Sequence, residues 1–124
     1  MQVRFQDRVA VVTGAGGAIG AEIARRLGSE GAELALADLD ADRLAVRREE
    51  LQREFGRAAL TVAGDLSEPA SAEEVVSACR ERFGRIDVLV NNAGGGVILP
   101  TLEHTEDTLQ ATLASNIWTA LRTT

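Results

Sequence analysis

The sequence of 124 residues has no tyrosine and no lysine, so all 13 of its basic residues are arginines. It has a single cysteine, Cys79, and a single histidine, His104. One cysteine excludes a disulfide framework and a cysteine-rich metal site within the chain, and we expect no metal. An unpaired thiol in an apolar setting is typical of a reducing compartment, so we expect the cytoplasm. The longest apolar runs are too short to span a bilayer, and no signal peptide is visible.

Positive charge is scarce as well. The arginines are outnumbered by 19 acidic residues, which gives a formal net charge of −6, and they form no run or stripe along the chain. Nucleic acid and anionic membrane surfaces are therefore not expected partners. The apolar fraction of 45% suffices for one hydrophobic core at this length, so we expect a single domain over residues 1–124.

Short apolar runs alternate with longer amphipathic segments along the whole chain. The pattern predicts strands over residues 8–13, 33–39, 58–63 and 86–90, and helices over residues 18–29, 41–55, 69–83 and 106–122. Strict alternation of this kind is typical of βαβ units on a parallel sheet. Right-handed crossovers then favour the strand order 3-2-1-4. The sequence therefore predicts an α/β fold with a Rossmann-type doubly wound parallel sheet.

A glycine-rich loop follows the first expected strand and reads Thr13-Gly14-Ala15-Gly16-Gly17-Ala18-Ile19-Gly20. Backbone N–H groups in such a loop can approach a pyrophosphate closely, and the positive end of the following helix dipole favours the anion. The candidate cofactor contacts in this loop are Gly14, Gly16, Gly17, Ala18, Ile19 and Gly20. A plain tight turn from strand to helix is the alternative interpretation of the same glycines.

Asp38 and Leu39 stand at the end of the second expected strand and are further candidate contacts. A carboxylate at this place can accept hydrogen bonds from both ribose hydroxyls of an adenosine. A phosphate on that ribose would instead meet a like charge, at a cost of up to about 4 kcal/mol per pair of unit charges ~4 Å apart at an effective dielectric constant of ~20. The expected cofactor is therefore NAD. An ordinary turn or capping aspartate, next to Asp40 and Asp42, is the alternative.

The fourth expected strand ends in Asn91-Asn92-Ala93-Gly94. Asparagine side chains can tie adjacent loops together, and a glycine lets the main chain pass close to a cofactor. We therefore expect Asn92, Ala93 and Gly94 to contact the cofactor. A loop of no special use, rich in asparagine and glycine, is the alternative.

These motifs together resemble the short-chain dehydrogenase/reductase family. The glycine loop has the spacing TGxxx[GA]xG, with Ala18 in the place of the middle glycine, and the Asn-Asn-Ala-Gly stretch is the second family signature. The resemblance covers the whole chain but only about the first half of a typical family domain. It implies hydride transfer between nicotinamide and a small alcohol or carbonyl substrate. It also implies that Asp65 contacts the adenine amino group and that Leu66 covers the adenine ring.

The family's catalytic set is Asn-Ser-Tyr-Lys, and the chain offers a counterpart for the asparagine alone. The resemblance implies that Asn116 is this catalytic residue and holds a water molecule of the proton relay by bending the last helix. The serine and the Tyr-x-x-x-Lys pair are expected beyond Thr124, so we predict no dehydrogenase turnover by the isolated chain. His104 is either a base at the cleft or a solvent-exposed residue. Residues 94–104 resemble those of dehydrogenases that act on cyclic diols such as dihydrodiol carboxylates.

Two further expectations concern the surface of the chain. The last expected helix has apolar residues at four-residue spacing, which predicts a buried face with Asn116 close to it: Leu109, Leu113, Ile117 and Leu121.

A fifth strand is expected beyond Thr124, so the sheet is truncated before strand five and strand four lies at its edge. Such an edge favours a marginally stable, self-associating chain, and we expect a homo-oligomer. The alternative to an enzyme is a non-catalytic dinucleotide-binding or interaction module.

Overall fold

The computed structural model describes residues 3–95 and 98–124 of the chain. Their strands form one parallel sheet in the order β3-β2-β1-β4, which confirms the predicted fold class and strand order. The strands are β1 (Val9–Thr13), β2 (Glu33–Asp38), β3 (Leu60–Ala63) and β4 (Val88–Val90). Since Val12 pairs with Val90 and Thr13 with Ala37, the carboxyl ends of three neighbouring strands meet at one edge of the sheet.

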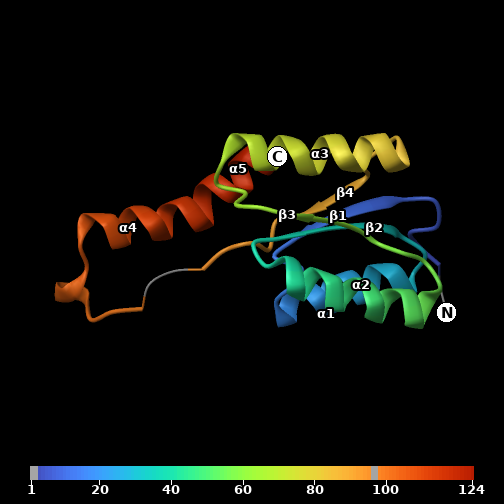
Figure 1. Cartoon of the computed structure of the whole chain (residues 1–124), viewed down its shortest axis with the longest axis horizontal. Helices are drawn as coiled ribbons and strands as arrows, with labels where there is room; N and C mark the ends of the chain where they lie inside the picture. The colour runs from blue at the N-terminus through green and yellow to red at the C-terminus, as the bar shows by residue number, and fades with distance from the viewer. Residues whose placement is uncertain (1–2, 96–97) are drawn as a thin grey trace.

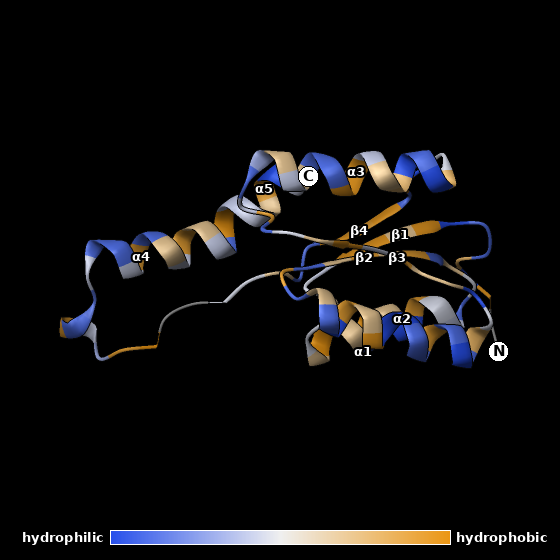
Figure 2. Cartoon of the chain, viewed as in Figure 1, coloured by the Kyte–Doolittle hydropathy of each residue, from blue (hydrophilic) through white to orange (hydrophobic). Residues whose placement is uncertain are grey.

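Helices cover both faces of this sheet. The helices α1 (Ala18–Ser29) and α2 (Ala41–Phe55) lie on one face, and α3 (Pro69–Phe83) and α5 (Thr119–Thr123) lie on the other (Figure 1). β1 is therefore buried at all of its positions, as expected for a central strand of a doubly covered sheet. Figure 2 shows the apolar residues gathered in the sheet, with hydrophilic residues on the outer sides of the helices. The described helices include none that is long and apolar enough to cross a membrane.

Local signals set the bounds of the first three helices, which match the predicted ranges. The carboxylate of Asp40 accepts hydrogen bonds from the backbone N–H groups of Asp42 and Arg43 and so caps α2. Both α2 and α3 end at a glycine in the left-handed region, Gly56 with φ 70° and Gly84 with φ 77°. The capping residues lie within a few residues of each helix end, so the sequence pattern is sufficient to locate these ends.

β3 and β4 begin two residues later than predicted and β1 one residue later, and side chains bond to the backbone next to the starts of β3 and β4. The Ala58 carbonyl accepts a hydrogen bond from the Arg82 guanidinium at 2.9 Å, and β3 begins at Leu60 rather than at residue 58. The Asp87 carboxylate accepts one from the Val9 N–H at 2.8 Å, and β4 begins at Val88 rather than at residue 86. Both departures lie at the end of the sheet away from the glycine loop.

At the same far end, a buried carboxylate ties the N-terminal segment to α1. Glu30 is 3% exposed and accepts hydrogen bonds from Arg4 at 2.7 and 2.8 Å and from Arg26 at 3.1 Å. The hydrogen bonds from Arg4 hold the pKa of Glu30 below its ordinary value of 4.5, because they favour the charged carboxylate. Two arginines thus compensate the burial of one negative charge.

The predicted helix over residues 106–122 is helical over its whole range, but a π-helical turn interrupts its α-helical pattern. After a short 3₁₀ turn (Thr101–Glu103), α4 (Glu106–Leu113) leads into a π-helical turn (Ala114–Trp118), and α5 follows. Its predicted buried face is wrong, since Leu109, Leu113, Ile117 and Leu121 are 47%, 45%, 47% and 62% exposed. Thr119 and Thr123 are buried instead, and α5 packs against α3. Their hydroxyls donate to the Ser115 and Thr119 carbonyls at 2.6 and 2.7 Å, so their burial leaves no polar group unsatisfied.

Candidate functional site

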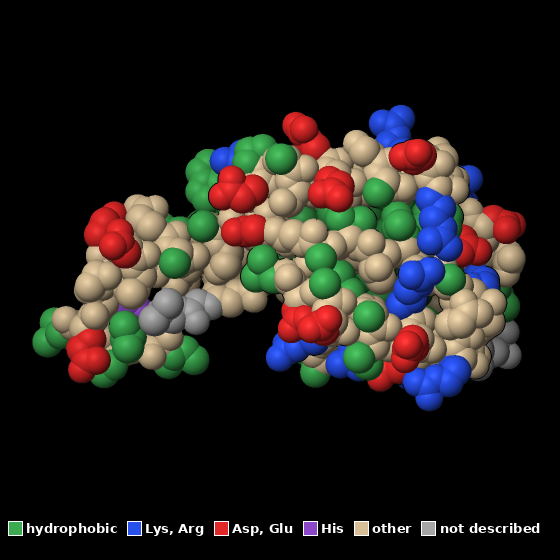
Figure 3. All heavy atoms as spheres, viewed as in Figure 1, with side chains coloured by type: hydrophobic (Ala, Val, Ile, Leu, Met, Phe, Trp, Pro, Cys, Tyr) green, Lys and Arg blue, Asp and Glu red, His purple; other side chains and the backbone are tan. Residues whose placement is uncertain are grey.

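A crevice of about 680 Å³ lies at the carboxyl ends of the strands, where the order of the sheet reverses between β1 and β4. Ligands of doubly wound sheets bind at this topological switch point. Figure 3 shows the molecule hollowed between its main body and the arm that carries α4. The crevice is lined by eleven of the thirteen predicted cofactor contacts: Gly14, Gly17, Ala18, Ile19, Gly20, Asp38, Leu39, Leu66, Asn92, Ala93 and Gly94.

The glycine loop closes tightly on itself. Gly14 has φ 66°, a conformation that side chains rarely adopt. A Cβ atom on Gly20 would overlap the Gly14 carbonyl oxygen and lie 2.8 Å from Asn92 Nδ2. Gly17 begins α1 without a side chain to cap it, and Ala18 and Ile19 of the first turn line the crevice. The N-terminal amides of α1 are therefore placed where a diphosphate would find backbone donors and a positive helix end.

Asp38 is held at the crevice by two backbone donors. Its Oδ2 accepts a hydrogen bond from the Gly16 N–H at 2.9 Å, and its Oδ1 accepts one from the Asp40 N–H at 3.0 Å. The hydrogen bond from the Asp40 N–H is the one expected of a turn aspartate, the alternative interpretation of Asp38. The bond to Gly16 fixes the same carboxylate against the glycine loop. Gly16 itself is buried and does not line the crevice.

Thr13 joins the loops that follow β1 and β4, a role that the sequence reasoning missed. Its buried hydroxyl accepts hydrogen bonds from the N–H groups of Asn92 at 3.0 Å and Ala93 at 2.9 Å, and donates to the Val90 carbonyl at 3.3 Å. The Asn92 side chain donates in turn to the Gly14 carbonyl at 3.4 Å. The available signal was a lone hydroxyl that ends an otherwise apolar strand and precedes the first glycine.

Asn116 lies on the π-helical turn and is exposed, which contradicts its predicted place near a buried face. Its side-chain amide donates to the Thr112 carbonyl at 2.8 Å and to the Gly95 carbonyl. The Ser115 hydroxyl donates to the same Gly95 oxygen at 3.0 Å. Asn116 thus ties the loop after β4 to the last helix. It does not line the crevice, although Thr112 and Ser115 do.

The other predicted residues, Asp65 and His104, do not line the crevice. Asp65 is exposed, and its Oδ1 accepts hydrogen bonds from the Ser67 N–H at 2.9 Å and the Ser67 hydroxyl at 2.6 Å, so it stabilises the turn before α3. His104 is half-buried and its Nδ1 lies 3.1 Å from the Thr108 hydroxyl. Residues 96–97 of the predicted segment 94–104 lie outside the described residues.

Cys79 takes no part in the crevice. It is fully buried in the core under α3, and this burial raises the pKa of its thiol. A thiol that stays protonated is a poor nucleophile and a poor metal ligand. Within residues 3–95 and 98–124, no three side chains of histidine, cysteine, aspartate or glutamate come together to hold a metal ion.

The comparisons with known proteins agree with this geometry. The family model for short chain dehydrogenase matches residues 8–124, and the chain belongs to that family of oxidoreductases. It is 46% identical over 117 residues to a 2,3-dihydroxy-2,3-dihydro-p-cumate dehydrogenase from Pseudomonas putida, a match that covers 94% of this chain and 45% of the relative. The family and the fold inferred from the glycine loop and the Asn-Asn-Ala-Gly motif are thereby confirmed.

Two solved structures show the same arrangement with different cofactors. The L-sorbose reductase of Gluconobacter frateurii, complexed with NADPH and L-sorbose, has a TM-score of 0.91 and 34% identity, and the match covers 99% of this chain and 47% of that one. A xylitol dehydrogenase bound to NAD+ has a TM-score of 0.90 and 32% identity, with 97% of this chain and 46% of that one covered. The chain thus spans less than half the length of each of these proteins.

Proposed function

We propose that this chain is the cofactor-binding domain of an NAD-dependent oxidoreductase, which transfers a hydride between nicotinamide and a small alcohol or carbonyl substrate. The observation that carries the proposal is the position of Asp38. Its carboxylate is fixed against the glycine loop by the Gly16 N–H and lines the same crevice as the first turn of α1. A dinucleotide needs this combination, because its diphosphate requires backbone donors and its ribose hydroxyls require an acceptor.

Each part of the crevice suits one part of the cofactor. The amides at the start of α1 would hold the diphosphate, and Asp38 would accept hydrogen bonds from the adenosine ribose. Leu66 lines the crevice and would provide an apolar surface for the adenine ring. Asn92, Ala93 and Gly94 line the crevice after β4 and would border the nicotinamide end. When bound, the nicotinamide ring supplies the site that accepts or donates the hydride.

The charge of Asp38 supports NAD as the preferred cofactor. Both of its oxygens already accept backbone hydrogen bonds, so its carboxylate cannot swing away from a phosphate on the neighbouring ribose. A 2′-phosphate would therefore be repelled, while free ribose hydroxyls can donate to the remaining lone pairs.

The likeness to a dehydrogenase named for a 2,3-dihydroxy-2,3-dihydro-p-cumate supports a cyclic diol as the substrate class. We also propose that the protein is cytoplasmic and forms homo-oligomers. The exposed apolar side chains of α4, the π-helical turn and α5 support the oligomer, because an unpaired apolar face of this kind favours association.

Calorimetric titration of the chain with NAD and with ADP-ribose tests the proposal. Both ligands should bind, and Asp38→Asn should weaken ADP-ribose binding about tenfold, because hydrogen bonds to a charged acceptor are stronger than those to a neutral one. Asp107→Asn is the matched control, since Asp107 lies in the first turn of α4 and does not line the crevice. The proposal fails if neither ligand binds, or if the two variants bind ADP-ribose equally well.

A further inference from the structure

An arginine outside the crevice also contacts the glycine loop. Arg47 lies on α2, and its Nη2 donates a hydrogen bond to the Gly16 carbonyl oxygen at 3.4 Å. The Arg47 side chain does not line the crevice but a separate groove of about 370 Å³ between α1 and α2. Gly16 is buried, and among residues 3–95 and 98–124 no other group donates to its carbonyl oxygen. Arg47 is therefore the partner that satisfies this carbonyl.

Gly16 is thereby held through both of its backbone polar groups. Its N–H donates to Asp38 Oδ2 at 2.9 Å, and its carbonyl accepts from Arg47. The next amide, that of Gly17, donates to the Gly14 carbonyl at 3.2 Å. The peptide between Gly16 and Gly17 thus has its N–H bound within the glycine loop and its carbonyl bound to α2. This second contact fixes the loop against a helix that the diphosphate itself does not need to touch.

The other nitrogens of Arg47 show that its place next to the loop is not set by stability alone. Its Nη1 donates to Glu50 at 2.9 and 3.1 Å, in an ion pair whose side chains are 29% and 47% exposed and which therefore contributes little. Its Nε is buried and finds no hydrogen-bond partner in the part of the chain that the structure describes, which is unfavourable. The gain and the cost nearly offset each other, so the removal of Arg47 should leave the free energy of unfolding almost unchanged.

We infer that Arg47 is a positioning residue of the cofactor site: by holding the Gly16 carbonyl on α2, it keeps the glycine loop in the shape that binds a diphosphate. The inference rests on the proposed function, because the loop is part of the same site. A peptide with a glycine on each side rotates with little steric hindrance, so a loop of this kind needs a partner to select one orientation. Without Arg47 a smaller fraction of molecules has the binding shape, and the apparent dissociation constant rises by the same factor.

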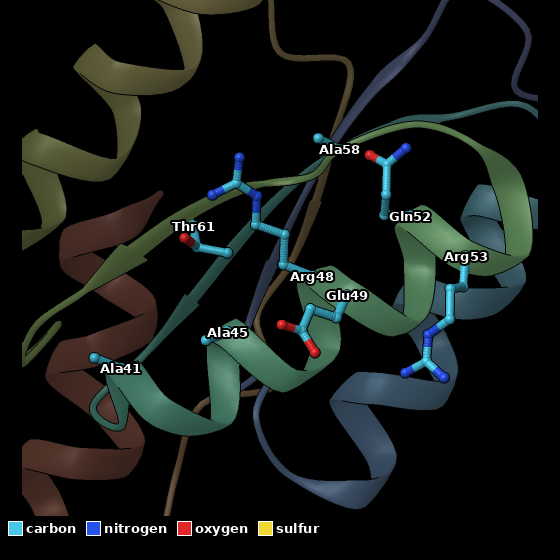
Figure 4. A pocket seen from close by; sticks show the side chains of 8 residues that line it. All are labelled: Ala41, Ala45, Arg48, Glu49, Gln52, Arg53, Ala58 and Thr61. Atoms are coloured by element: carbon cyan, nitrogen blue, oxygen red, sulfur yellow. The ribbon is translucent and has the colours of Figure 1, made fainter.

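The same helix provides a matched control for the charge of Arg47. Arg48 is the next residue of α2 but lines a different groove, of about 590 Å³, beside β3. Figure 4 shows its side chain reaching from α2 into this groove, together with that of Thr61 from β3. Arg48→Ala removes the same charge from the same helix without touching the glycine loop.

Calorimetric titration of the 124-residue chain with ADP-ribose tests the inference, alongside urea unfolding of each variant. Arg47→Ala should weaken ADP-ribose binding about fivefold, as expected for the loss of one hydrogen bond, while its urea midpoint stays close to that of wild type. Arg47→Lys keeps a charged donor and should restore part of the affinity, and Arg48→Ala should leave it unchanged. In the ligand-free chain, NMR should show faster hydrogen exchange of the Gly17 amide in Arg47→Ala than in Arg48→Ala.

The outcomes separate the inference from the proposed function. If Arg47→Ala binds ADP-ribose as tightly as Arg48→Ala, or if Arg47→Lys restores nothing, the inference is overturned while the proposed function stands. Equal exchange of the Gly17 amide in the two alanine variants overturns it as well. If wild type does not bind ADP-ribose, the proposed function itself fails, and the exchange of Gly17 still decides whether Arg47 holds the loop.

Discussion

Replacing Gly20 with alanine tests whether the glycine loop is as tightly closed as the structure shows. A Cβ atom there would overlap the Gly14 carbonyl oxygen and lie 2.8 Å from the Asn92 side-chain amide. Alanine gains about 1 kcal/mol of helix propensity over glycine, and loss of the bond from Asn92 to Gly14 costs about 1 kcal/mol. These two effects cancel, so the steric clash decides whether the variant is less stable than wild type. Overpacking costs about 1–3 kcal/mol, and we expect the upper part of this range because the clashing atom belongs to the backbone.

Urea unfolding followed by circular dichroism measures this loss, and an NAD titration should show at least tenfold weaker binding, because the loop must open to admit the methyl group. Gly17→Ala is the control in the same loop. Gly17 has φ −78°, and its Cβ would lie 3.6 Å from the Gly14 oxygen, an ordinary contact. We expect it to cost about 0.5 kcal/mol, from the weaker N-cap preference of alanine. Equal urea midpoints for the two variants, with unchanged NAD affinity in Gly20→Ala, would refute the reasoning.

Four further predictions follow from the same contacts. Thr13→Val should lower the free energy of unfolding by about 2 kcal/mol, because it leaves the part-buried Ala93 N–H without its acceptor and leaves the Asn92 N–H only the Val90 carbonyl; Thr13→Ser should restore most of it, and equal urea midpoints for the valine and serine variants would contradict this. Since the pKa of Glu30 is lowered by folding, its ion pairs stabilise the fold above its ordinary value of 4.5 and are lost as the pH falls through the lower folded value. Glu30→Gln should therefore flatten the acid side of the stability curve measured by urea unfolding at several pH values, and a curve parallel to that of wild type would exclude this role. The 124-residue chain should not oxidise alcohols with NAD, and steady NADH formation by the purified chain would count against this. Leu113→Glu should lower the average mass found by analytical sedimentation, whereas a monomeric wild-type chain would rule out association through this face.

The sheet order and the first three helices could be predicted because their signals are local. Caps such as Asp40, Gly56 and Gly84 mark helix ends within a few residues. The crevice could be predicted for a related reason, since parallel strands bring their carboxyl ends together and the glycine loop and Asp38 each follow a strand. Asp65 follows a strand as well, but its side chain accepts a hydrogen bond from the Ser67 N–H in the turn. The position of Asp65 after a strand does not reveal this local bond.

The last helical segment could not be predicted in the same way. The spacing of Leu109 and Leu113 indicates a helix with an apolar face, but it does not indicate what that face packs against. The π-helical turn depends on tertiary contacts, among them the bonds from Ser115 and Asn116 to the Gly95 carbonyl. Thr119 can be buried because its hydroxyl donates to the Ser115 carbonyl of its own helix. A prediction that takes only apolar residues as buried places a threonine on the surface.

The arm formed by residues 98–113, which include α4, projects from the body of the molecule (Figure 1). α4 packs chiefly against the adjoining π-helical turn and meets the crevice only through Ala111 and Thr112. An insertion or a substitution in the outer arm should therefore change the packing of the sheet little. Residues of the outer arm can thus differ between related chains while the sheet and the glycine loop keep their arrangement.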